Sequence, residues 1–141
     1  MGVRRPERLY ASPADTNGVS LETLTPDENA TPAPAVVDRF AHLADEVTIT
    51  VWGADWCGDC QRVLPVFAAI LEAADVPTER VTAIAVDREK QGPGVDAYDI
   101  EYIPTIVIER NGTELARFVE SADRPVGEVL AEQLDIAIDS T

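Results

Sequence analysis

The chain has 141 residues, which suits one domain with a single core, and its net charge is −15, from 26 acidic and 11 basic side chains. This acidity argues against binding to nucleic acid or to an anionic membrane surface, because both partners select basic faces. No apolar run approaches the length of a membrane span and no apolar segment follows Arg4-Arg5, so we expect a cytoplasmic protein.

Two regions of the chain differ in composition. Residues 1–33 are rich in proline and small polar residues, which predicts a loosely ordered, extended N-terminal arm. Residues 34–141 carry the periodic apolar patterns of a folded domain. Its first predicted element is an amphipathic helix over residues 35–44, starting near Pro34. We expect His42, the only histidine, to be a surface or packing residue of this helix rather than a ligand.

The next predicted elements alternate between strand and helix. A β-branched run predicts a buried strand over residues 47–52, and apolar residues at helical spacing predict a helix over 58–74. Pro65 lies inside this helix and should kink it. A strand over 81–86 follows, and because a helix joins the two strands they should form a right-handed parallel βαβ unit. A short helix is predicted at 94–98.

The C-terminal part of the chain predicts a hairpin and a helix. Strands over 104–109 and 113–119 flank Asn111-Gly112, a dipeptide typical of tight hairpin turns. Asp123 and Pro125 then open a last helix with an apolar face. The expected fold class is therefore α/β, with the element order βαβ followed by ββα.

The only two cysteines, Cys57 and Cys60, lie at the junction between the first predicted strand and the following helix. At a helix N-terminus, unpaired backbone N–H groups and the helix dipole favour a thiolate over a thiol. The second sulfur lies one turn away, close enough to close a small disulfide ring. This arrangement indicates a redox-active dithiol.

Other interpretations of the cysteine pair stay open. A zinc site needs four ligands, so His42 with a carboxylate, or a second chain, would have to complete it. A structural disulfide across so short a loop would add little stability. The two thiols could also be inert core residues.

Four sequence features occur together in one order and spacing. They are Trp56-Cys57-Gly58-Asp59-Cys60, Pro65 five residues later, Ile103-Pro104-Thr105 before the third strand, and the Asn111-Gly112 turn. With these features, residues 47–138 resemble a thioredoxin-fold domain. The resemblance implies a central mixed four-stranded sheet flanked by helices.

The resemblance also implies roles for the matching residues. Cys57 would attack a substrate disulfide to form a mixed disulfide, and Cys60 would resolve it. Pro104 would follow a cis peptide bond, the alternative being a trans proline that only begins a strand. No metal or bound cofactor is expected besides the redox disulfide. The residues expected to shape the site or contact substrate are Trp56, Gly58, Asp59, Ile103 and Pro104.

The chain departs from the family's reductases at several positions. Val51 stands at the place of their buried acid, and Ala83 at the place of the lysine that partners this acid. Gly53 replaces their usual tryptophan, and Gly58-Asp59 replaces Gly-Pro between the cysteines. The buried proton acceptor thought to help deprotonate the resolving thiol is therefore missing.

Asp59 is expected to act on Cys57 through its charge. A carboxylate about 6 Å from a thiolate costs roughly 0.7–2.8 kcal/mol for an effective dielectric constant between 80 and 20, against about 0.3–1 kcal/mol gained from the helix end. Asp59 should therefore favour the disulfide form, less so in molar salt. The alternative is a solvated residue at the start of a helix.

The function predicted from the sequence is thiol–disulfide oxidoreduction, with protein disulfides reduced by dithiol–disulfide exchange through Cys57 and Cys60. The expected partners are protein disulfide substrates and a separate electron-donating reductase, and we expect a monomer. The alternative is a thioredoxin-fold binding or adaptor module with little redox activity. A further possibility is metal or cluster binding between two chains through their cysteine pairs.

The distribution of charged residues suggests an environment of high salt. Lys90 is the only lysine beside ten arginines, and the acidic residues are dispersed along the chain. This pattern resembles proteins of salt-accumulating, halophilic archaeal cells, in which concentrated counterions screen the self-repulsion. The alternative is an ordinary acidic protein from a GC-rich genome.

Overall fold

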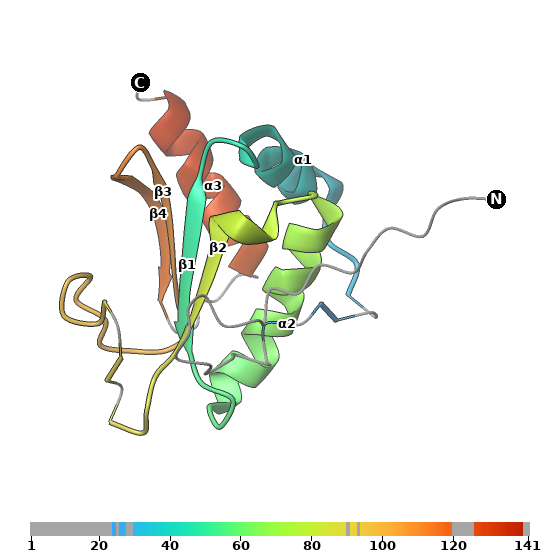
Figure 1. Ribbon diagram of the computed structural model, residues 1–141. Coiled ribbons are helices and arrows are strands. Elements are labelled where there is room, and N and C mark those ends of the chain that lie inside the picture. The colour runs from blue at the N-terminus through green and yellow to red at the C-terminus, as the bar shows by residue number, and fades with distance from the viewer. Residues whose placement is uncertain are drawn as a thin grey trace.

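The structure is a computed structural model that describes residues 24, 26–27, 30–89, 91–92, 94–119 and 126–139. These residues form one mixed four-stranded sheet in the order β2-β1-β3-β4, flanked by helices (Figure 1). The expected order of βαβ followed by ββα is confirmed. The elements are α1 (Pro34–Leu43), β1 (Thr48–Gly53), α2 (Gly58–Ala73), the 3-10 helix η1 (Thr78–Arg80), β2 (Val81–Ala85), β3 (Thr105–Arg110), β4 (Thr113–Val119) and α3 (Val126–Asp139).

The pairing of the strands places the end of β1 in the middle of the sheet. β1 runs parallel to β2, to which α2 connects it, and antiparallel to β3. Four of the six residues of β1 are buried, in line with its run of β-branched residues and its neighbours on both edges. The carboxyl end of β1 therefore delivers the cysteine motif from a rigid central strand.

The hairpin between β3 and β4 forms where Asn111-Gly112 predicts it. Asn111 has φ 54° and Gly112 φ 82°, both in the left-handed region. Two successive residues of this kind make the tight turn whose twist matches that of antiparallel strands. The strands pair from Arg110↔Thr113 to Thr105↔Val119, with one irregularity after Ile108.

The core joins the three helices to the sheet. Phe40 of α1 meets Phe67 of α2 edge to face, with ring centroids 6.0 Å apart. Leu130 of α3 is buried in the same core. Leu24 is also buried there, and the backbone N–H of Asp27 donates to Pro65 O at 3.1 Å. This short N-terminal segment thus packs on α2, while most of the predicted arm over residues 1–33 lies outside the described residues.

The predicted helix at 94–98 is wrong. Residues 94–99 form a turn, in which the Tyr98 N–H donates to Gly94 O at 3.0 Å. Gly94 has φ 79° and Asp99 has φ 55°, so left-handed residues at both ends stop a right-handed helix from propagating. Asp123 and Pro125, expected to open the last helix, lie outside the described residues. None of the described helices is long and apolar enough to cross a membrane.

Candidate active site

Cys57 is the N-cap residue of α2. Its backbone is extended, and its Sγ accepts a hydrogen bond from the Cys60 backbone N–H at 3.5 Å. The turn before it is fixed by the Cys57 N–H, which donates to Ala54 O at 3.2 Å, and by Gln61 Nε2, which donates to Asp55 O at 2.7 Å. The half-buried sulfur therefore meets the unpaired N–H groups of the first helical turn, a position that favours negative charge.

Cys60 lies one turn into α2 and is fully buried, with 0% of its surface exposed. Burial is the main reason that the pKa of this thiol is raised to about 12; the Ala54 N–H, which donates to its Sγ at 3.4 Å, lowers the pKa, and the charges of Cys57 and Asp55 raise it. Both cysteines are free thiols. The pair thus combines one accessible sulfur with one sheltered sulfur.

The loop before β3 lies against the accessible sulfur. The Ile103–Pro104 peptide is cis, and the Cys57 thiol donates to Ile103 O at 3.9 Å. The Thr105 hydroxyl donates to Tyr102 O at 2.6 Å, which ties the start of this loop to its end. Thr105 is 1% exposed and is the one non-sulfur polar side chain buried in the described part of the chain. In the sequence Thr105 is recognisable only as part of the Ile-Pro-Thr motif, and no local signal indicates this contact.

Two exposed aromatic side chains border the cysteine. Trp56, next to Cys57, is 40% exposed, and Tyr102, next to Ile103, is 48% exposed. The Arg88 guanidinium lies over the Trp56 ring, 5.2 Å from the ring centroid. Neither Tyr102 nor Arg88 was among the residues expected at the site. An exposed aromatic beside the Ile-Pro motif could have indicated Tyr102, but no local signal connects Arg88 with Trp56.

The two residues between the cysteines differ in what surrounds them. A Cβ atom at Gly58 would meet no atom within 4 Å, so the space beside this residue is open. Asp59 forms an ion pair with Arg62, three residues along the same helix, and the Arg62 side chain is mostly exposed. The effect expected of Asp59 was that of an unpaired carboxylate, although the i,i+3 spacing of these two residues predicts the pairing.

Two of the positions that differ from the family's reductases are apolar and buried. Val51 of β1 and Ala83 of β2 are register neighbours in the sheet, and both are buried. No carboxylate is buried anywhere in the described residues. A backbone N–H, from Ala54, is therefore the hydrogen-bond donor that the structure provides for the Cys60 sulfur.

The described residues contain no group of three or more metal-ligand side chains of the His, Cys, Asp and Glu types. His42 is exposed in the last turn of α1, the surface position expected for it. In Figure 1 α1 lies at the end of the molecule opposite the start of α2. His42 and the cysteines therefore do not converge.

The family profile described as "Thioredoxin" matches residues 36–133 of this chain. The chain belongs to the thioredoxin family. A thioredoxin of Chlamydia trachomatis is 31% identical over 88 residues, which cover 62% of this chain and 82% of that protein. The mitochondrial thioredoxin-2 of Schizosaccharomyces pombe is 32% identical over 89 residues, 63% of this chain and 64% of that protein.

A solved structure of similar fold is that of a Pseudomonas aeruginosa protein of unknown function. Its TM-score is 0.53 at 18% sequence identity, with 77% of this chain and 73% of that chain covered. At this identity the likeness concerns the fold alone. Membership of the thioredoxin family supports a thioredoxin-like redox function for the chain.

Proposed function

We propose that this thioredoxin-family protein is a thiol–disulfide oxidoreductase that reduces protein disulfides through Cys57 and Cys60. One observation carries the proposal: a half-buried sulfur caps α2, and a fully buried thiol lies one helical turn away. Because the two sulfurs differ in access, the accessible one can meet a substrate while the sheltered one can only meet its partner. Dithiol exchange requires these two roles, one thiol that attacks the substrate disulfide and one that resolves the mixed disulfide.

The proposed reaction has two exchange steps. The Cys57 thiolate attacks one sulfur of the substrate disulfide; that S–S bond breaks, and the departing thiolate takes up a proton. The Cys60 thiol then loses its proton to solvent and attacks Cys57 Sγ, which releases the second substrate thiol. Two electrons have then passed to the substrate, and the protein holds a Cys57–Cys60 disulfide.

The loop before β3 would hold the substrate during the first step. Ile103 O already faces the Cys57 sulfur, so an extended segment on either side of a cystine would run along this backbone. Trp56 and Tyr102 offer exposed apolar surface at the same place. The open space at Gly58 leaves room for the chain that follows the attacked sulfur.

The proposal extends to the setting of the reaction. The protein would act as a monomer in the cytoplasm of a salt-accumulating cell, without a metal or bound organic cofactor. A separate dithiol reductase would return its disulfide to the dithiol, because the substrate reaction consumes both thiols. The net charge of −15 supports a high-salt setting, since concentrated counterions screen the repulsion among 26 acidic side chains.

A second candidate function is a binding module with little redox activity. One observation favours it: burial raises the pKa of Cys60 to about 12, and no buried carboxylate among the described residues stands ready to take its proton. A slow second step would leave the protein bound to its target. The oxidoreductase is the better supported candidate, because a pure adaptor has no use for an accessible sulfur at a helix N-terminus.

Reduction of insulin disulfides by catalytic amounts of the full chain, with dithiothreitol as reductant, separates the two candidates. We expect the wild-type protein to accelerate the reaction, Cys57→Ser to abolish the acceleration, and Cys60→Ser to accumulate a mixed disulfide. His42→Gln is the control, because His42 lies away from the site. A wild-type protein that gives no rate above dithiothreitol alone contradicts the proposal and favours the binding module.

A further inference from the structure

Arg88 is a cation placed at the edge of the cysteine site by a segment distant in the sequence. It lies in the loop after β2, and its guanidinium carbon is 5.2 Å from the centroid of the Trp56 ring. This distance is within the range of a cation–π contact, in which the positive charge is attracted to the face of the ring. Since Trp56 directly precedes Cys57, the contact places a positive charge over the residue next to the attacking cysteine.

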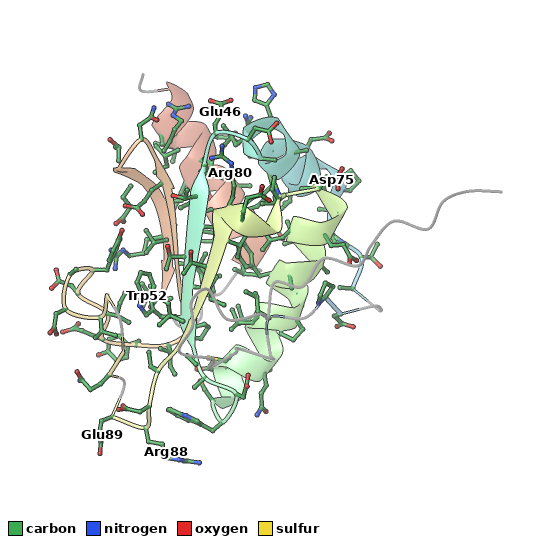
Figure 2. All side chains as sticks on the ribbon, in the orientation of Figure 1. Glu46, Trp52, Asp75, Arg80, Arg88 and Glu89 are labelled. Carbon is green, nitrogen blue, oxygen red and sulfur yellow. The ribbon has the colours of Figure 1, made fainter. Side chains whose placement is uncertain are left out.

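The loop that carries Arg88 is tied at its base. The Asp87 carboxylate accepts hydrogen bonds from the backbone N–H groups of Glu89 and Gln91, both at 2.9 Å. The Val86 N–H donates to Gly53 O at 2.9 Å, which fastens the loop to the end of β1. Figure 2 shows Arg88 and Glu89 at the end of the molecule where α2 begins. The backbone position of Arg88 is therefore set by the fold.

Arg88 has no ion-pair partner among the described residues and can therefore bind a charged group of a substrate. Arg62, the other cation near the cysteines, pairs with Asp59. Asp87 directs its carboxylate at backbone N–H groups of its own loop. No carboxylate among the described residues is within ion-pair distance of Arg88. Its planar fork of N–H donors, which matches a carboxylate well, is thus open at the site.

We propose that Arg88 is a specificity-determining residue of the Cys57 site, selecting disulfide-bonded segments that carry a carboxylate next to the attacked cystine. The inference rests on the proposed function and names its substrate class. A segment that reaches Cys57 passes over Trp56, where the guanidinium can bind an acidic side chain directly. An aspartate or glutamate adjacent to the cystine would fit this contact; a lysine or arginine there would meet like charge.

The net charge of the protein acts in the opposite direction at long range. A protein with a charge of −15 repels acidic substrates and attracts basic ones in dilute salt. At about 1 M salt the screening length falls to about 3 Å, which removes the long-range repulsion while a direct ion contact partly survives. The preference for acidic segments should therefore be measurable in molar salt and be masked in dilute buffer.

The test compares three peptides with the same disulfide and Glu, Gln or Lys beside the cystine. The pre-reduced full chain reacts with each in about 1 M KCl, and each rate is divided by the same variant's rate on the neutral 2-hydroxyethyl disulfide. For the wild type we expect the Glu peptide to react about two- to fivefold faster than the Gln peptide, and the Lys peptide more slowly. In Arg88→Met this ratio falls to one, whereas Arg88→Lys keeps part of it.

Arg110→Met is the matched control. It removes the same charge from the far end of β3, where Arg110 pairs with Glu46, and Figure 2 shows Glu46 at the opposite end of the molecule from Arg88. It should leave the peptide ratio unchanged. The inference is overturned if the active wild type shows no preference for Glu over Gln, or if Arg88→Met retains the wild-type ratio. Failure of the wild type to reduce any disulfide, the neutral one included, overturns the proposed function and this inference with it.

Discussion

The burial of Cys60 predicts that the second exchange step is slow at neutral pH and accelerates steeply with pH. The pKa of this thiol is raised from 9.0 to about 12. A shift of about three units lowers the thiolate fraction at neutral pH about a thousandfold, equivalent to about 4 kcal/mol. Thiolates of higher pKa are more nucleophilic, with a Brønsted coefficient of about 0.4–0.5, so the deficit in rate is about 30- to 60-fold.

The assay loads Cys57 with 5-thio-2-nitrobenzoate as a mixed disulfide and follows the release of the coloured thiol by Cys60. In this adduct Cys57 carries no charge, so burial remains as the main cause of the raised pKa. The rate should rise about tenfold per pH unit and still be climbing at about pH 10, above the ordinary thiol pKa of 9.0.

A variant pair separates burial from charge in this assay. Asp55 is exposed and its charge raises the pKa of Cys60, so Asp55→Asn should speed the release at a given pH. Asp45→Asn, which neutralises an exposed carboxylate beyond α1, is the control and should not. A release rate that levels off at or below about pH 9 contradicts a pKa raised by burial, because the buried thiol would then ionise like a solvated one.

Three further predictions follow from the same site. Cys60 ionises near pH 9.0 in the unfolded chain and near pH 12 in the folded chain. Its contribution to the free energy of unfolding is therefore full below about pH 9 and is lost between about pH 9 and 12, by about 1.4 kcal/mol per pH unit. Denaturant unfolding at several pH values should show this loss for the wild type and not for Cys60→Ala. Thr105→Val removes the donor to Tyr102 O and should lower the free energy of unfolding by about 1–3 kcal/mol in urea titrations, whereas Thr105→Ser should retain most of it; equal losses would contradict a role for the hydroxyl. Asp59→Asn frees the Arg62 charge and should make the reduction potential less negative, while Arg62→Gln should make it more negative; both shifts should shrink in molar salt, and shifts of the same sign would refute the pairing.

Local signals in the sequence predicted much of the fold. Asn111-Gly112 specified the hairpin because both residues tolerate positive φ, and the turn forms there. The β-branched run before the cysteines and the apolar spacing after them located β1 and α2 within one residue at each end. In each case a short stretch of chain carries its own structural preference, so no distant contact had to be known.

The features that the sequence did not predict depend on contacts between distant segments. Leu24 is apolar in a polar stretch, which suggests that it docks, but only the packed core shows where it is buried. Arg88 reaches Trp56 because the loops after β1 and β2 lie side by side; the sequence predicts the parallel strands but not which side chains of their loops meet. The predicted helix at 94–98 does not form, because Gly94 and Asp99 at its two ends adopt positive φ.

The direct test of the central claim is the reduction potential of the Cys57–Cys60 pair. The full chain is equilibrated in molar salt against a series of dithiothreitol or glutathione ratios, and its free thiols are counted by alkylation. Our account predicts one reversible two-electron transition between dithiol and intramolecular disulfide, near the value of about −270 mV known for thioredoxin. A potential above about −180 mV would contradict a role as a reductant, and the absence of a reversible couple would contradict the redox function itself.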